Sequence, residues 1–281
     1  MFRGRGALFV ALIAIGCSGS STTPTPTTGT AVTQYVFSQI QGNVVDTAFQ
    51  SLAGVRVEIV DGSEAGTFTI SDANGRFSFS GGQYVDGIHF RASKDGYNTI
   101  SVSGPLQFPW PSAVASLLIT LDSIAAPAKI EPGAYSLTVI ADSSCTGIPG
   151  DLRTRTYSAT IAPSRDRPST VYIVDVTGPS LAPFGFGIGV AGNHLAFTID
   201  GPGFFEHLPP FKYLDIAGTG GTSLDVSPAS TIRFPFSGSF EYCELRSEMG
   251  RTNNCYTTPS DQKVADSQCR SANDQMILTR R

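Results

Sequence analysis

The chain has 281 residues, of which 41% are hydrophobic and only 15% are charged, with 30 glycines and 18 prolines. This length favours about two domains, and the low charge with many glycines and prolines favours turn-rich β structure over helix bundles. The net charge of −4 excludes the basic surface that holds nucleic acid, so we expect no nucleic-acid partner.

Residues 1–16 predict an export signal. Two arginines precede an apolar stretch, Ala7 to Ile15, which is too short to span a bilayer as a helix. The residues Ala14-Ile15-Gly16-Cys17 resemble the lipobox of bacterial lipoproteins. The resemblance implies a lipid on Cys17 and, with Ser18 next, sorting to the outer membrane, on its periplasmic or cell-surface face. The alternative is an ordinary secretory signal with Cys17 near the cleavage point by chance.

Residues 17–33 predict a tether that begins at the lipidated cysteine. Residues 18–33 hold no charge and almost no apolar bulk, so they cannot bury enough surface to offset the entropy of ordering. We expect a flexible Ser/Thr/Pro segment that holds the folded part away from the membrane.

Residues 34–123 predict a first folded unit, an antiparallel β-sandwich, because apolar residues alternate with polar ones. The turn Asp72-Ala73-Asn74-Gly75 is expected to close a tight hairpin, since Asn and Gly tolerate positive φ. A calcium loop is excluded there, because the third oxygen ligand and the glutamate at position 12 are missing. The alternating residues are Val55, Val57, Ile59, Phe68, Ile70, Phe77, Phe79, Ile88, Phe90 and Ala92, and a closing strand is expected at Leu117 to Leu121.

The order of these elements resembles the carboxypeptidase regulatory-like domain. The matching residues are Gly42 to Asp46, Leu52 to Val57, Thr69 to Phe79 and Lys94-Asp95-Gly96-Tyr97. The resemblance implies a transthyretin-like β-sandwich of a family that is mostly non-catalytic and whose fold is often grouped with carbohydrate-binding sandwiches. It does not transfer a sugar site to this chain.

Phe108 and Trp110 lie in a proline-rich segment, Leu106 to Pro111. Aromatic rings on a stiff loop could stack on a sugar or fill a partner's pocket, so both are candidate ligand- or partner-binding residues. The alternative is a plug over the end of the sandwich, or the seam between the two domains.

Residues 128–281 predict a second β unit after a short linker. Eight candidate strands with turns between them predict an antiparallel barrel or a second sandwich. We recognise no family here, although Gly133-Ala134-Tyr135 and the late Arg280 faintly resemble lipocalins, whose barrels can enclose one small ligand. The strands are expected at 133–141, 154–162, 170–177, 186–191, 194–200, 211–217, 231–242 and 275–280.

Four cysteines remain if Cys17 carries a lipid, and all lie in this second unit. An even number in an exported chain predicts two disulfides with three possible connectivities. In a closed barrel the first and last strands are neighbours, which favours Cys145–Cys269 and leaves Cys243–Cys255. A metal site is the rival interpretation, but no Cys-x-x-Cys pair or nearby histidine supports it.

The search for catalytic chemistry finds little. The three histidines, His89, His194 and His207, have no metal-ligand spacing, and no nucleophile elbow or phosphate loop occurs. We therefore expect no enzyme, no metal and no cofactor. Strand-end carboxylates leave a hydrolase as a weaker hypothesis, although aspartates there commonly serve turns; they are Asp142, Asp151, Asp200 and Asp215.

The aromatic segment from Phe204 to Phe211 is expected to be a loop that caps a barrel or forms an interaction surface. Its candidate contact residues are Phe204, Phe205, His207 and Phe211. Together these expectations predict a non-enzymatic, lipid-anchored outer-membrane protein that serves binding, adhesion or envelope assembly, with a glycan or an envelope protein as partner. The alternative is a carrier that holds a small apolar ligand in the C-terminal barrel.

Overall fold

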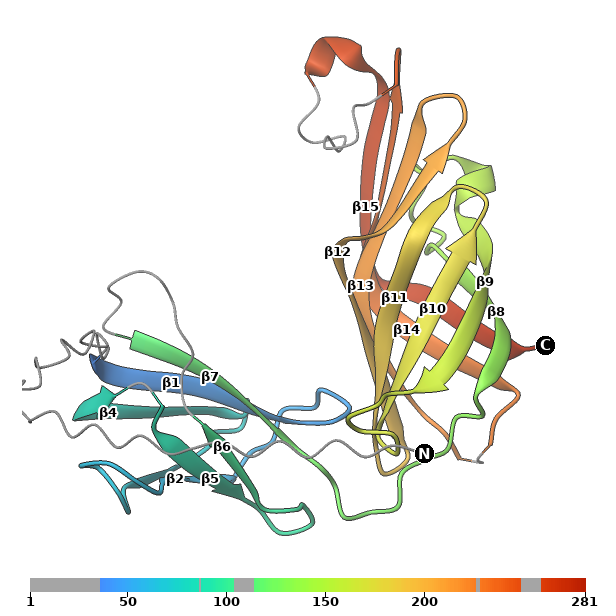
Figure 1. Ribbon diagram of the computed structural model, residues 1–281. Coiled ribbons are helices and arrows are strands. Elements are labelled where there is room, and N and C mark those ends of the chain that lie inside the picture. Colours follow the sequence, from blue (N-terminus) through green and yellow to red (C-terminus); the bar gives the residue numbers. More distant parts are fainter. Residues whose placement is uncertain (1–35, 86, 104–113, 226–227, 249–258) are drawn as a thin grey trace, which may run out of the picture. The chain divides into compact units, whose positions relative to one another are not determined.

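The computed structural model describes residues 36–85, 87–103, 114–225, 228–248 and 259–281 (Figure 1). The predicted signal, Cys17 and the tether fall within residues 1–35 and therefore lie outside the described residues. The described part is all-β, as expected, with two short 3-10 turns, Gly150–Leu152 and Ser260–Gln262. Within it, no helix has the length and apolarity needed to cross a bilayer.

Seven strands form two sheets in the N-terminal part. The strand order is β4-β1-β7 in one sheet and β3-β2-β5-β6 in the other. Apolar residues of both sheets share one core, in which Ile40, Val57 and Phe90 are fully buried. The strands are β1 (Val36–Asp46), β2 (Arg56–Ile59), β3 (Phe68–Ile70), β4 (Arg76–Val85), β5 (His89–Ser93), β6 (Ile100–Ser103) and β7 (Val114–Leu121).

Two details of this part differ from the prediction. The pair β1–β7 is parallel, because side-chain alternation reports which face is buried and not the direction of the neighbouring strand. The turn at Asp72 exists, with the Oδ1 atom of Asp72 accepting the N–H groups of Asn74 and Arg76 at 2.8 Å each. It joins β3 of one sheet to β4 of the other and does not close a hairpin.

The C-terminal strands form a closed barrel of eight antiparallel strands (Figure 1). Each strand pairs with the next along the chain, and β15 closes the barrel on β8 with Gln275 opposite Ile140. A barrel was one of the two predicted forms. The strands are β8 (Gly133–Ile140), β9 (Thr154–Pro163), β10 (Val171–Gly178), β11 (Leu181–Ala191), β12 (His194–Leu208), β13 (Lys212–Ser223), β14 (Thr231–Leu245) and β15 (Lys263–Arg280).

Aromatic side chains fill the barrel interior. Phe197 packs edge-on against Phe234 at a centroid distance of 5.2 Å, and lies 5.8 Å from Phe236. Glycine makes room for these rings: a Cβ on Gly220 would lie 2.6 Å from the ring of Phe197, and one on Gly238 would lie 2.5 Å from that of Phe236. Eight strands enclose an interior that side chains alone can fill. The largest fully buried rings are Tyr135, Phe197, Phe204, Phe234, Phe236 and Phe240.

Chain segments close the two ends of the barrel. At one end Ile130 is buried in the barrel core, and its N–H faces the hydroxyl of Tyr172 at 3.4 Å. At the other end Ile148 and Leu152, from the segment between β8 and β9, enter the same core. The described interior is therefore covered at both ends by buried apolar residues.

The predicted disulfide Cys145–Cys269 is present, with an S–S distance of 2.01 Å. It ties the β8–β9 segment to β15, and a hydrogen bond of 2.8 Å from the N–H of Asp142 to Asp274 reinforces the link. Because β15 begins at Lys263, Cys269 lies inside the last strand and not before it. Cys243 is disulfide-bonded as well, while its predicted partner Cys255 lies outside the described residues.

Candidate interaction surface on the barrel wall

The segment predicted as an aromatic loop is mostly a strand. Residues up to Leu208 belong to β12, and the chain turns only at residues 209–211. Alternation along the strand then separates the predicted contact residues. Phe204 is fully buried in the core, so its placement on an exposed loop is wrong, whereas Phe205 and His207 lie on the outer wall. The pairing of β12 with β13 resumes at Phe204, because the register between the two strands shifts in an irregular stretch between Ile199 and Phe204.

Four rings form what we call the aromatic face: Phe205, His207, Phe211 and Tyr213. His207 stacks on Tyr213 with a centroid distance of 4.7 Å and an angle of 8° between the planes. Phe205 stacks on the same tyrosine at 5.6 Å and 22°. Tyr213 is buried, while the other three are only half-buried. The face therefore presents apolar ring surface to solvent from a rigid pair of strands.

Phe211 is held in an unusual backbone conformation beside this face. Its φ is 55°, a left-handed value that bulky residues rarely adopt. Its carbonyl accepts the N–H of Leu245 at 3.0 Å, and its side chain packs with the buried group of Tyr213, Cys243 and Leu245. Contacts with β14 thus fix the turn that carries the ring.

Inside the wall, directly behind the aromatic face, lies a buried ion pair. Glu206 is 1% exposed and binds Arg155 through both carboxylate oxygens, with the Nε–Oε2 bond at 2.9 Å. Tyr157 donates its hydroxyl to the same carboxylate at 2.8 Å, and burial with this bond raises the pKa of Tyr157. Each oxygen of Glu206 is thus satisfied, so the group fixes β12 against β9 and leaves no carboxylate free for chemistry.

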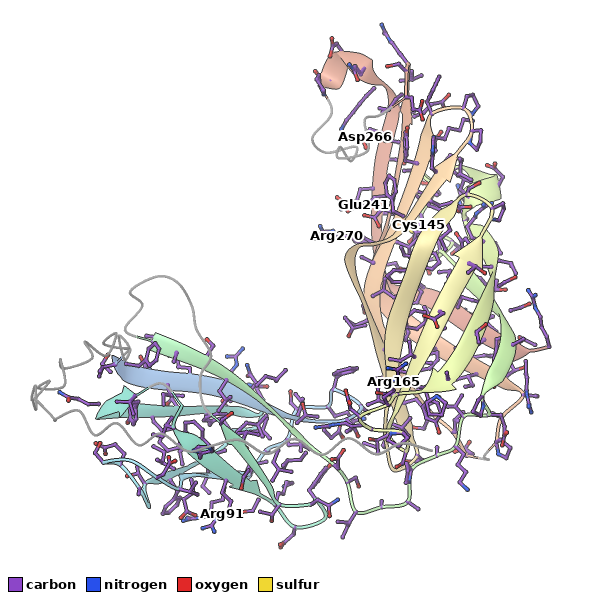
Figure 2. The ribbon with its side chains drawn as sticks, in the orientation of Figure 1. Arg91, Cys145, Arg165, Glu241, Asp266 and Arg270 are labelled. Carbon is purple, nitrogen blue, oxygen red and sulfur yellow. A yellow bond between two sulfur atoms is a disulfide. The ribbon has the colours of Figure 1, made fainter. Side chains whose placement is uncertain are left out.

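A carboxylate pair continues the outer wall next to the aromatic face. Asp215 on β13 lies directly opposite Glu241 on β14, and Figure 2 shows Glu241 on the outer side of the barrel. Burial, followed by the charge of Glu241, raises the pKa of Asp215 to about 6. One buried oxygen of Asp215 has no hydrogen-bond partner within the described structure, so this residue destabilises the fold when ionised.

The structure leaves some predicted residues untested and adds others that the sequence did not indicate. Phe108 and Trp110, like Cys17 and Cys255, lie outside the described residues. Sequence reasoning missed Tyr213, although its position two residues after Phe211 in the next strand would indicate it once the turn at residues 209–211 is recognised. The partners Arg155 and Tyr157 of Glu206 could not be found by spacing, because β9 and β12 are far apart in the chain.

No group of three metal-ligating side chains occurs in the part of the chain that the structure describes. His89 lies against Asp61 at 2.6 Å, and His194 against Ser223 at 2.9 Å. Of the strand-end carboxylates, Asp142 follows β8 and Asp215 lies on β13, which are three strand spacings apart in the barrel order, or about 14 Å along the wall. These two carboxylates therefore form no pair that would support the hydrolase hypothesis.

Comparison with known proteins adds little to this geometry. No protein-family model matches the chain, and no curated protein matches it. Among solved structures it is similar to a protein of unknown function from Bacteroides fragilis NCTC 9343, described as a putative membrane-associated protein, at 10% identity and a TM-score of 0.23, over 88% of this chain and 98% of that one. A likeness this distant carries no argument about function.

Proposed function

We propose that the protein is a non-enzymatic, lipid-anchored module of the bacterial outer membrane that binds a glycan or an envelope protein. The observation that carries this proposal is the aromatic face, where Phe205 and His207 stack on Tyr213 and remain half-buried on a rigid wall. Rings that are held in place lose little entropy on binding, and they commonly dominate the energetics of contact surfaces. Adhesion or envelope assembly would follow from such a contact.

The lipid anchor at Cys17 and the outer-membrane location rest on the lipobox resemblance. The carboxypeptidase regulatory-like identity of the N-terminal part rests on its quoted motifs, and seven strands in two sheets around one core support it. The carrier alternative gains no support from the described residues, because buried rings fill the barrel interior and both ends are covered. The carrier function stays a prediction.

The test compares variants of the full chain in membranes of a Gram-negative host. Phe205→Ser with His207→Ser should lower retention of isolated envelope polysaccharide, or cross-linking to an envelope protein, by about tenfold. Phe68→Ser serves as the control, because Phe68 is an exposed aromatic residue, 51% accessible, on the N-terminal part. Equal binding by wild type, double variant and control would contradict a role for the aromatic face.

A further inference from the structure

The outer wall of the barrel is hollowed beyond the carboxylate pair, on the side that faces away from the aromatic face. Ala217 is the next outward residue after Asp215 on β13, and Ser239 lies opposite it on β14. From there the hollow extends to β15, with an open volume of about 560 Å³, which is within the usual range of ligand sites. Hydroxyl groups line it, and they belong to Thr219, Ser237, Ser239 and Ser271.

Two irregularities of the sheet bend the wall at this hollow. The register between β12 and β13 shifts after Ile199, which pairs with Gly218. The register between β14 and β15 shifts between Phe236 and Gly238, and Gly238 lies opposite Gly218. Both shifts therefore fall at one level of the barrel, and such bulges are frequent next to functional sites because they bend the strand.

The hollow and the carboxylate pair place hydrogen-bond donors and acceptors on one surface. Arg270 lines the hollow, and Figure 2 shows it on the same side of the barrel as Glu241. The amide of Gln268 donates a hydrogen bond to Glu241, which fixes the direction of this carboxylate. Phe205 lies opposite Asp215 at the other end of the row. Four neighbouring strands thus offer a guanidinium, carboxylates, hydroxyl groups and a half-buried ring.

This combination favours a sugar over a protein as the partner. Contact surfaces between proteins are depleted in serine, alanine, aspartate and glutamate, which are the residue types that dominate here. A sugar presents hydroxyl groups, each of which donates and accepts, beside apolar C–H faces that an aromatic ring covers. From β12 to β15 the site spans three strand spacings, or about 14 Å, so the ligand is longer than one sugar ring.

We propose that the hollow, together with the row from Phe205 to Gln268, binds an oligosaccharide segment of an envelope glycan. Glu241 accepts hydrogen bonds from sugar hydroxyl groups, Arg270 donates to them, and Phe205 covers a sugar ring. The inference rests on the proposed function and selects the glycan as the partner. Asp215 fits this assignment, because a group that weakens the fold is expected mainly where function requires it.

Filling the hollow tests the proposal with the full chain, purified in mild detergent, and envelope polysaccharide freed of protein. Thr219→Phe places a ring in the hollow and should lower retention of the polysaccharide about tenfold. Thr160→Phe is the matched control, because Thr160 is also exposed and lies on β9, on the opposite side of the barrel. Equal retention by the two variants would overturn the inference.

A second pair of variants tests the contact without adding bulk. Glu241→Gln keeps the shape of the side chain but removes the charge of the acceptor, so retention should fall about tenfold. Asp175→Asn removes the same charge from an exposed residue of β10 and should leave retention unchanged, and no difference between the two would contradict the contact. If Phe205→Ser with His207→Ser lowers cross-linking to an envelope protein while every variant retains the polysaccharide, the saccharide inference fails and the proposed function stands.

Discussion

At the scale of single residues, two carboxylates of the barrel wall are in opposite situations. Glu206 is held by Arg155 and Tyr157, whereas Asp215 faces Glu241 and leaves one oxygen without a described partner. A buried charge is tolerated when it is paired and costs free energy when it is not. The first group therefore fastens strands together, and the second weakens the fold.

Replacing Glu206 by alanine should strongly destabilise the barrel. The change leaves the guanidinium of Arg155 inside the wall without its carboxylate, which costs about 3 kcal/mol or more in the free energy of unfolding. Denaturant unfolding of the full chain measures this cost. Glu58→Ala is the control, because its partners Arg56 and Arg91 have side chains that are 38% and 51% exposed, so that water solvates them when the carboxylate is removed and the loss should be much smaller. Equal losses would show that the buried pair has no special structural role.

Replacing Asp215 by asparagine should stabilise the protein at neutral pH. The pKa of this group is about 6 in the fold against about 3.9 in an unfolded chain. The native state therefore binds the proton more tightly, and its stability falls as the pH rises from about 4 through 6. Asp215→Asn removes this fall and should gain about 1 kcal/mol at pH 7.5, after allowance for solvent screening. Thermal unfolding at a series of pH values checks both effects, and an unchanged slope would refute the assignment.

At the scale of elements, the strands follow from sequence where alternation is regular. The predicted starts of β8, β9, β12 and β14 agree with the structure, and those of β10 and β13 differ by one residue. The failure at Phe204 to Leu208 has a local cause. Gly201-Pro202-Gly203 is typical of a loop, but here it falls in the irregular stretch of β12, after which the strand pairs again with β13.

The packing of glycine against interior rings gives a prediction for β13. Gly220→Ala should cost about 2 kcal/mol, because the new methyl group meets Phe197, Phe236 and a backbone oxygen, all within 2.7 Å. Gly187→Ala on β11 is the control, since nothing lies within 4 Å of its added Cβ, and it should be neutral or slightly stabilising. Similar unfolding midpoints for the two variants would show that the interior is looser than described.

At the scale of the whole molecule, closure of the barrel made one disulfide predictable. Once β8 and β15 are neighbours, Cys145 and Cys269 meet, despite a separation of 124 residues. The side chains that fill the barrel interior were not predictable in the same way, because their packing depends on which aromatic rings meet across the barrel. The opposition of Asp215 and Glu241 depends likewise on strand register, which no local pattern determines.

Removing this disulfide should lower the stability of the whole barrel. Cys145→Ser with Cys269→Ser frees a long loop in the unfolded chain, and such a loss typically costs about 3 kcal/mol. The variant should still show native β structure by circular dichroism, because Asp274 continues to hold the β8–β9 segment. Calorimetry of the oxidised wild type and the variant measures the difference, and identical unfolding temperatures would contradict a structural role.

The most direct test of the account is native mass spectrometry of the full chain, purified gently from the membranes of a Gram-negative host. We predict a mass that matches residues 17–281 with a lipid on Cys17 and no other bound molecule, because side chains fill the barrel and the contact surface lies outside it. A stoichiometric additional mass of a small apolar molecule, which disappears on denaturation, would contradict this account and favour the carrier hypothesis.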